Sequence, residues 1–179
     1  MYNYVGDLCS IYHFIINNYI ENKKVAIDAT LGNGHDTDFL SKNFNRVYAF
    51  DIQKNAIDNY KEKKKDNVVL INDSHSKFRN YINEEVQCIV YNLGFLPGGD
   101  KSITTSGIEV VETLKKACEC LNSNGKIIVV CYPGFEAGMN ESILVENYLK
   151  ELSSKQFDVY SFKLLNRKNA PYIIGIEKH

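Results

Sequence analysis

Short apolar runs that alternate with helical patterns constrain this chain more than any other feature. The β-rich runs cover residues 25–28, 46–51, 68–71, 88–91 and 126–131. Amphipathic helical patterns lie at 8–20, 36–43, 54–64, 76–83, 104–121 and 140–153. Continuous apolar runs are typical of parallel strands covered on both faces. The alternation therefore predicts a parallel sheet with helices on both sides.

The last two apolar runs, 157–165 and 172–177, break this alternation. The gap at 166–171 can hold a tight connection but no crossover helix, so these two strands should be antiparallel. The predicted fold is α/β and Rossmann-like, a seven-stranded, mostly parallel sheet with a C-terminal antiparallel hairpin and helices on both faces. With 179 residues and no repeat or linker, we expect a single domain, with an N-terminal helix in 1–22 and the core in 23–179.

Composition excludes several classes of protein. A formal net charge of -1 argues against a protein coated in positive charge, although a local basic patch would not change that sum. The longest apolar stretches, such as 127–132, are far shorter than the ~20 residues of a membrane span. The N-terminus lacks the pattern of a signal peptide, so we expect a cytoplasmic protein without a membrane partner. The five cysteines lack zinc-finger spacing, which favours reduced structural thiols and no metal.

A glycine-containing loop, 28–37, follows the first strand and opens the first inter-strand helix. In an open α/β sheet, a nucleotide-like ligand binds outside the carboxyl ends of the strands, where this loop lies. Asp51 ends the second strand, 23 positions after Asp28, and a carboxylate there can accept hydrogen bonds from ribose hydroxyls. An ordinary tight turn and a solvated strand-end acid are the alternatives. The predicted cofactor-binding residues of these two segments are Asp28, Thr30, Gly32, Asn33, Gly34, Asp36, Thr37, Asp51 and Gln53.

Acidic residues in this loop distinguish between two candidate cofactors, NAD and S-adenosylmethionine. A dinucleotide loop would have a third glycine near Thr37, and Asp28 and Asp36 would repel a pyrophosphate. The same carboxylates suit the ammonium and sulfonium groups of S-adenosylmethionine (SAM), although Asp36 is also a favourable acid for a first helical turn. The chain has no P-loop motif. We therefore expect SAM and not NAD as the cofactor.

Two further loops lie at the same edge of the predicted sheet. Asp73, Ser74 and His75 follow the third strand, where they could contact adenine or serve as a helix cap. Asn92 ends the fourth strand, across the cleft from Asp28, because the first and fourth strands flank the topological switch point. The loop after it resembles the Asn/Asp-Pro-Pro-aromatic loop of amino methyltransferases, with Leu93 and Gly94 in place of the prolines. The catalytic candidates are Asn92, Leu93, Gly94 and Phe95, which would orient an amine toward the methyl group, and Asn92 would also touch the cofactor.

Three segments together resemble one family. They are 27–37, 48–53 and 92–101, and they are similar to the MnmM (YtqB-like) class I methyltransferases, first described as rRNA methylases. The resemblance runs nearly end to end, and it implies a class I methyltransferase fold. His13 matches a family histidine, and 169–171 resembles a C-terminal Asn/Pro element. One position departs from the family, because Phe135 stands where a histidine is expected after 132–134.

The resemblance implies a SAM-dependent N-methyltransferase that acts on the wobble uridine of tRNA. It would convert 5-aminomethyl-2-thiouridine to 5-methylaminomethyl-2-thiouridine. The partner implied is tRNA, and a homodimer stays open. His13 and His75 are candidate proton acceptors, with a structural role as the alternative. The residues expected to meet substrate or RNA are His13, Pro97, Gly98, Asp100, Lys101, Arg167 and Lys168.

Three alternatives stay open. The basic cluster around 163–168 could meet phosphates, whereas the run at 61–65 is more typical of a solvated helix end. The segment 98–101 could be only a surface turn. The protein could also methylate rRNA or a small molecule, at nitrogen or oxygen, or bind SAM without catalysis.

Overall fold

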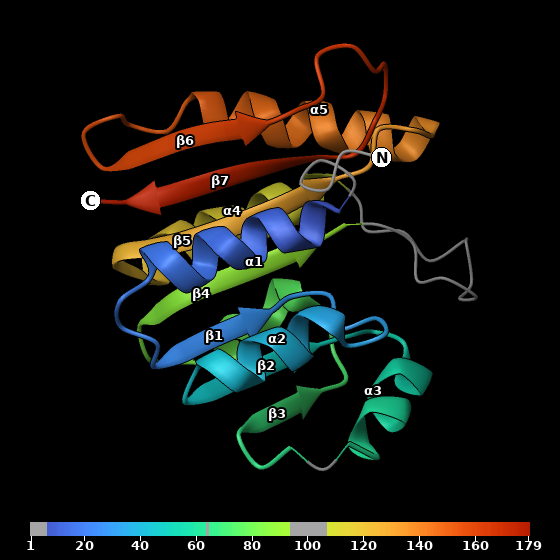
Figure 1. Ribbon diagram of the computed structural model, residues 1–179, viewed down its shortest axis with the longest axis vertical. Coiled ribbons are helices and arrows are strands. Elements are labelled where there is room, and N and C mark those ends of the chain that lie inside the picture. Colours follow the sequence, from blue (N-terminus) through green and yellow to red (C-terminus); the bar gives the residue numbers. More distant parts are fainter. Residues whose placement is uncertain (1–6, 64, 94–106) are drawn as a thin grey trace.

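The fold is a single seven-stranded sheet with helices on both faces (Figure 1). The computed structural model describes residues 7–63, 65–93 and 107–179. The order of the strands across the sheet is β3-β2-β1-β4-β5-β7-β6. The strands are β1 (Val25–Asp28), β2 (Arg46–Phe50), β3 (Val68–Ile71), β4 (Val86–Asn92), β5 (Leu121–Cys131), β6 (Phe157–Phe162) and β7 (Tyr172–Lys178).

Strand direction agrees with the sequence prediction. β1 to β5 pair in parallel, and β7 runs antiparallel to both β5 and β6. The predicted α/β class with an antiparallel C-terminal pair is therefore confirmed. The pairing also places β7 between β5 and β6, so that the final strand lies inside the sheet and β6 forms its edge.

The helices divide between the two faces of the sheet. One face is covered by α1 (Leu8–Tyr19) and α2 (His35–Asn43), which bury Tyr12, Ile16 and Leu40 against the sheet. The other face is covered by η1 (His75–Asn80), α4 (Gly107–Cys120) and α5 (Glu136–Lys150). The remaining helix, α3 (Lys54–Lys61), buries its apolar face against Leu31 and against residues of β2 and β3. Both faces of the central strands are thus covered, which is why their sequences are continuously apolar.

The switch point lies where the sequence predicts it. β1 pairs with β2 on one side and with β4 on the other, and Asp28 lies opposite Val90 in the register with β4. Chain connections therefore leave in opposite directions from this point, which opens a crevice at the carboxyl ends of β1 and β4. These ends lie on the right of Figure 1.

Several elements differ from the sequence prediction, and α3 and β6 end three residues earlier than predicted. The helix expected at 76–83 is the short 3₁₀ helix η1, which Ser74 caps by accepting from the Ser76 N–H. The helix expected at 140–153 begins earlier, at Glu136. β5 begins at Leu121, which pairs with Val86 before the predicted turn at 122–125 shifts the register. No helix in the described part of the chain is long and apolar enough to cross a membrane.

Candidate cofactor and acceptor site

The loop between β1 and α2 is shaped by two glycines. Gly32 and Gly34 have φ of 51° and 78°, in the left-handed region that side chains disfavour. At Gly34 a Cβ atom would also overlap the ring of Tyr60. The loop closes on itself through the Gly34 N–H, which donates to the Leu31 carbonyl at 2.7 Å. It therefore presents bare backbone at the switch point, as a close-lying ligand requires.

Asp51 connects this loop to the end of β2. Its Oδ2 accepts from the Gly32 N–H at 2.9 Å, and its Oδ1 accepts from the Gln53 N–H at 2.8 Å. The carboxylate is partly exposed. A carboxylate has about four acceptor positions, and the described residues occupy two of them, which leaves two for hydroxyl donors. The glycine loop thus orients the side chain of Asp51, the residue predicted to bind the ribose.

Asp28 is fully buried and has a supporting contact at each oxygen. Oδ1 accepts from the Thr30 N–H at 3.0 Å, and Oδ2 accepts from the Thr37 hydroxyl at 2.5 Å. Burial, with the nearby charge of Asp36, raises the pKa of Asp28 well above its ordinary value. Through these two contacts Asp28 fixes the loop at Thr30 and the first turn of α2 at Thr37.

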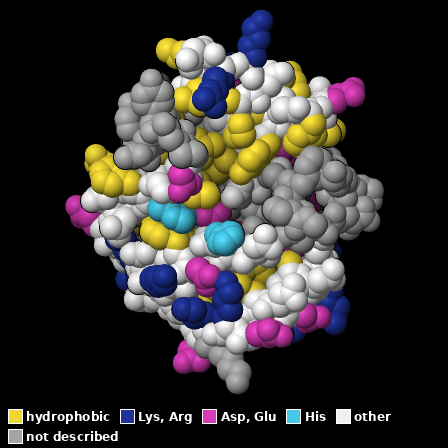
Figure 2. Space-filling view, turned by 45° about the vertical axis from the view of Figure 1, so that its right-hand side comes forward, with side chains coloured by type: hydrophobic (Ala, Val, Ile, Leu, Met, Phe, Trp, Pro, Cys, Tyr) yellow, Lys and Arg dark blue, Asp and Glu magenta, His cyan; other side chains and the backbone are white. Residues whose placement is uncertain are grey.

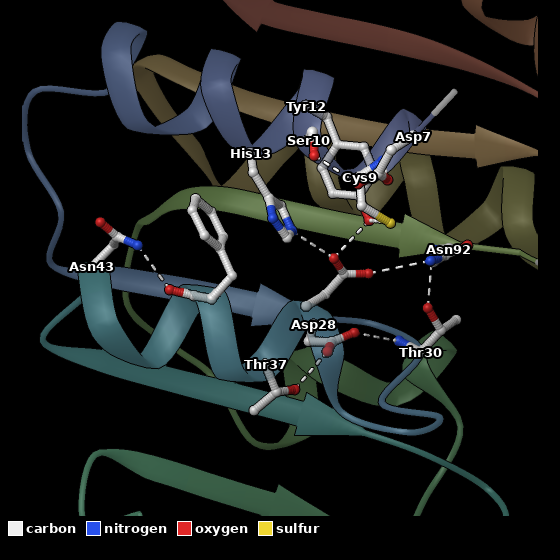
Figure 3. A network of polar contacts seen from close by, with 12 residues as sticks. Asp7, Cys9, Ser10, Tyr12, His13, Asp28, Thr30, Thr37, Asn43 and Asn92 are labelled. Atoms are coloured by element: carbon white, nitrogen blue, oxygen red, sulfur yellow. Dashed lines mark hydrogen bonds and ion pairs between the residues drawn. The ribbon is translucent and has the colours of Figure 1, made fainter. Parts of the chain in front are cut away.

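Asp36 is the centre of a polar network beneath the N-terminal helix. Its Oδ1 accepts from the Tyr12 hydroxyl at 2.6 Å and bonds His13 Nε2 at 2.8 Å, and its Oδ2 accepts from Asn92 Nδ2 at 3.2 Å. In Figure 3 the dashed lines from Tyr12, His13 and Asn92 converge on this one carboxylate. Three segments far apart in the sequence, α1, α2 and the end of β4, are held together at this point.

The electrostatics of Asp36 follow from these partners. Burial alone would raise its pKa, but the hydrogen bonds from His13, Tyr12 and Asn92 outweigh burial and hold the pKa below its ordinary value. The His13 ring stacks on Phe39, with centroids 3.8 Å apart, which fixes the imidazole in place. The network therefore contains an ionised carboxylate that is only 5% exposed.

Asn92 has its side-chain amide fixed in one orientation. Asp36 can only accept, so the Nδ2 group must face it, and Oδ1 then faces Tyr132. The Tyr132 hydroxyl donates to Oδ1 at 2.8 Å, and burial raises the pKa of Tyr132 to about 12, so the hydroxyl keeps its proton. The Asn92 backbone N–H donates to Thr30 Oγ1 at 2.9 Å. Among the described residues, Tyr132 is the single donor to Oδ1, which leaves one acceptor position of this oxygen at the carboxyl end of β4.

The loop after β3 is occupied mainly by contacts within the chain. Asp73 accepts from the Ser74 N–H, from Lys77 and from the Tyr81 hydroxyl, all at 2.8 Å. Ser74 donates to Glu109 and caps η1. His75 is 5% exposed, and within the described residues neither of its ring nitrogens has a hydrogen-bond partner. Burial lowers the pKa of His75 to about 4, so its ring is neutral.

The structure brings most predicted site residues to one edge of the sheet. His13, Asp28, Thr30, Asp36, Thr37 and Asn92 share one network, and Gly32, Asp51 and Gln53 share another. Asn33 is exposed in the glycine loop, and Leu93 is buried with its N–H bonded to Val130. Arg167 and Lys168 are exposed in the β6–β7 connection. The other predicted residues lie outside the described residues: Gly94, Phe95, Pro97, Gly98, Asp100 and Lys101.

Sequence reasoning missed two members of this site. Tyr12 belongs to a helical apolar pattern, and only its 2.6 Å bond to Asp36 distinguishes it from a core residue. Tyr132 lies one residue beyond β5, and its contact with Asn92 depends on the pairing of β4 with β5. In the described part of the chain, no group of three or more His, Cys, Asp or Glu side chains could hold a metal ion.

Comparison with known proteins identifies similar chains over nearly the full length. The family model described as "Putative rRNA methylase" matches residues 47–177. An Arabidopsis thaliana protein named tRNA (mnm(5)s(2)U34)-methyltransferase, chloroplastic, is 34% identical over 184 residues, which cover 93% of this chain and 67% of that protein.

Two solved structures match closely. The first, described as a putative rRNA-methylase from Clostridium thermocellum, has a TM-score of 0.91 and 37% identity, and covers 96% of this chain and 97% of that one. The second, described as a putative methyltransferase from Streptococcus mutans in complex with SAH, has a TM-score of 0.86 and 32% identity, with the same coverage.

Proposed function

Because this chain belongs to the rRNA methylase family whose model matches residues 47–177, we propose that it is a SAM-dependent methyltransferase that acts on tRNA. Its substrate is the 5-aminomethyl group of 2-thiouridine at the wobble position, and its product is the 5-methylaminomethyl nucleoside. The observation that carries this proposal is the Asn92 amide, which Asp36 and Tyr132 fix at the end of β4, next to the loop between β1 and α2. The Arabidopsis relative, named for the same reaction, supports the choice of substrate.

The cofactor pocket of the proposal is the crevice around the glycine loop. Gly32 and Gly34 let the backbone lie close to the ligand, and Asp51 accepts from the ribose hydroxyls. The ionised Asp36 carboxylate is a favourable neighbour for the positively charged end of the ligand. Bound SAM supplies an electrophilic methyl group on a sulfonium. The relative from Streptococcus mutans, solved in complex with SAH, supports this cofactor.

Asn92 is the residue that we assign to the acceptor amine. With Nδ2 bound to Asp36 and one Oδ1 position bound to Tyr132, the remaining Oδ1 position can accept one amine N–H. That bond orients the nitrogen lone pair, so the contribution of the protein is mainly proximity and orientation. Asp36 and Tyr132 prevent the Asn92 amide from rotating, so this side chain loses little conformational freedom when substrate binds.

The tRNA partner and a cytoplasmic location belong to the same proposal. Arg167 and Lys168 are exposed cations in the β6–β7 connection, which begins and ends near the carboxyl ends of the sheet. A few such contacts predict modest RNA affinity with a strong dependence on salt. A homodimer stays a prediction from the sequence.

One incubation tests the function. Purified protein and SAM are mixed with tRNA that carries 5-aminomethyl-2-thiouridine, and the digested nucleosides are measured by mass spectrometry. A gain of one methyl group on that nucleoside alone is the expected result. Methylation of the free nucleoside as efficiently as of tRNA would favour the small-molecule alternative instead.

The Asn92→Ala variant tests the assignment of the acceptor site. We expect loss of turnover by about 10²-fold or more, because orientation of the amine is lost, while SAM affinity changes less than twofold. SAM affinity is measured by calorimetry on the same preparation, with the unfolding midpoint as a control for folding. Turnover at the wild-type rate would contradict the role of Asn92.

A further inference from the structure

A groove beside the edge strand β3 takes no part in the function described so far. It is a cavity of about 230 Å³ between the C-terminal end of α3 and β3. This volume is smaller than the ~300–1,000 Å³ of pockets for drug-sized ligands, so the groove is suited to one or two side chains. Its walls combine an aromatic ring, two aliphatic side chains and three charged ones: Tyr60, Val68, Leu70, Lys61, Lys65 and Asp66.

The backbone of β3 is available for pairing along this groove. Within the described residues β3 pairs with β2 alone, and in Figure 1 it is the lowest strand of the sheet. The Ile71 carbonyl accepts from the Asp51 N–H, just beyond β2, at 3.1 Å. Every second residue of a strand turns its backbone to the same neighbour, so Val68 and Leu70 turn theirs outward. The described residues thus leave the Leu70 N–H and both of these carbonyls to pair with another chain.

The same two positions form an apolar floor for the groove. Val68 and Leu70 are half-buried and pack with Tyr60 in one small hydrophobic cluster. Val69, between them, faces the other side of the sheet and is 42% exposed. An extended segment beside β3 would therefore bond the Leu70 backbone and place every second side chain on this floor. This is the arrangement in which domains bind peptides by strand addition.

Two lysines select the charge of the occupant. Lys61 and Lys65 line the groove together with Asp66, so two positive charges and one negative charge leave its walls at +1. No described residue forms an ion pair with Lys65, and Lys61 reaches Asp58 only at 3.4 Å on an exposed surface. Figure 2 shows that Lys and Arg side chains gather in the lower half of the molecule, which contains α3 and β3. Positive charge beside an edge strand disfavours pairing with β3 of a second copy and favours an acidic segment.

We propose that this groove binds an extended acidic segment of a partner protein, which adds to the sheet as a strand beside β3. An aliphatic side chain of the segment would lie on the apolar floor, and carboxylates two positions before and after it would reach Lys61 and Lys65. Main-chain hydrogen bonds supply affinity in such complexes, and the side-chain pocket supplies specificity. The inference does not depend on the proposed function, because the groove lies at β3, two strands away from β1.

The test uses the whole protein and short synthetic peptides with blocked ends. The fitted peptide is Thr-Glu-Thr-Val-Thr-Glu-Thr, in which the valine and both glutamates share one face of a strand. An NMR titration of isotope-labelled protein should give saturable shifts at residues 68–71, with a Kd below ~1 mM. At saturation, hydrogen exchange of the Leu70 amide should slow by about fivefold or more, because a peptide carbonyl accepts from it.

Two N-methylated peptides test the strand pairing. Methylation of the valine nitrogen removes an N–H from one edge of the peptide strand, and methylation of the preceding threonine nitrogen removes one from the other edge. Because only one edge can face β3, one of these peptides should bind about tenfold more weakly than the parent, and the other within about twofold of it. Equal affinities of the two methylated peptides would overturn the proposal.

Charge reversal tests the two lysines. In the double variant Lys61→Glu and Lys65→Glu, the fitted peptide should bind about tenfold more weakly, and a peptide with lysines in place of its glutamates should bind more tightly than the fitted one. Lys54→Glu is the matched control, because Lys54 belongs to the same helix and bonds Asp58 but does not line the groove. This control should bind the fitted peptide within about twofold of wild type. Unfolding midpoints measured on each variant check the fold.

Three other outcomes would also overturn the proposal. If residues 68–71 show no saturable shifts up to ~1 mM peptide, no acidic segment binds there. If Lys54→Glu weakens binding as much as the double variant, general charge and not the groove holds the peptide. If an anticodon stem-loop displaces the peptide and shifts the same residues, the groove is an RNA surface instead. Methylation activity decides none of these outcomes, so the proposed function is tested separately.

Discussion

Substitution of Asp36 by Asn tests the network that joins α1, α2 and β4. The Asp36 carboxylate is 5% exposed and accepts from Tyr12, His13 and Asn92. Asparagine has nearly the same shape but only one acceptor oxygen, and its amide group would face donors. The substitution therefore removes hydrogen bonds without leaving a large cavity.

The magnitude follows from the geometry of the three bonds. Hydrogen bonds to a charged group contribute about 1.5–3 kcal/mol each. The bonds to Tyr12 and His13 are short, at 2.6 and 2.8 Å, whereas that to Asn92 is 3.2 Å and weaker. An Asn oxygen in the Oδ1 position can keep the bonds to Tyr12 and His13, but without the charge that strengthens them, and the bond to Asn92 is lost because two amide nitrogens then face each other. We therefore expect a loss of ~3 kcal/mol from the free energy of unfolding. Typical domains have only about 5–15 kcal/mol in total.

Urea unfolding monitored by circular dichroism measures this loss, with Asp38→Asn as the matched control. Asp38 also accepts from a tyrosine and a cation, Tyr60 and Lys63, but its side chain is 31% exposed. Exposed ion pairs contribute about 0–1 kcal/mol, so the control should lose no more than ~1 kcal/mol. Turnover should fall in Asp36→Asn alone, because Asn92 loses the partner that fixes its amide.

Equal losses of stability in the two variants would refute this reasoning, since burial would then not matter at this position. Wild-type turnover in Asp36→Asn would refute the claim that Asp36 is needed to fix the amide of Asn92. In that case Tyr132 alone suffices to orient Asn92.

Three further predictions concern single positions. Asp51→Ala should weaken SAM binding about tenfold by calorimetry, because ribose hydroxyls lose a charged acceptor; unchanged affinity would exclude Asp51 from the pocket. Gly34→Ala should lower the free energy of unfolding by at least ~2 kcal/mol, from left-handed strain and overlap with Tyr60, which a thermal melt detects as a fall of several degrees. Burial lowers the pKa of His75 from 6.5 to about 4, so the unfolded chain takes up this proton first as the pH falls, and stability is lost between pH 6.5 and 4. The difference in pKa corresponds to ~3 kcal/mol of the free energy of unfolding. A His75→Phe variant should lack this loss of stability in urea titrations between pH 6.5 and 4. The same loss in the variant as in the wild-type protein would contradict the prediction.

The sequence predicts the sheet well because its signal is local. The runs at 25–28 and 68–71 coincide with β1 and β3, and the short gap at 166–171 correctly requires antiparallel strands. The helix boundaries are less accurate. The helix predicted at 76–83 is the short 3₁₀ helix η1, and a periodic apolar pattern does not distinguish such a turn from an α-helix.

The sequence predicts which residues lie at the site, but it does not predict which side chains contact one another there. Strand ends and glycines identify Asp28, Asp36, Asp51 and Asn92 as members of one edge, because topology alone brings them together. Whether Asp28 faces a ligand or supports the loop depends on side-chain packing, and its full burial was not visible in the sequence. The role of Tyr132 depends on strand register, which a single sequence does not specify.

The position of β7 has a consequence for how this chain reaches its final form. Residues 172–178 lie between β5 and β6, so a chain halted before Tyr172 would have β5 with one unpaired edge and β6 with no neighbour. Unpaired edges of apolar strands recruit other chains. The same seven residues also cover α1 through Ile173, which packs in one cluster with Tyr12 and Ile16. An interrupted chain would therefore be prone to aggregation, and the acceptor end of the sheet could take its final shape only after β7 had inserted.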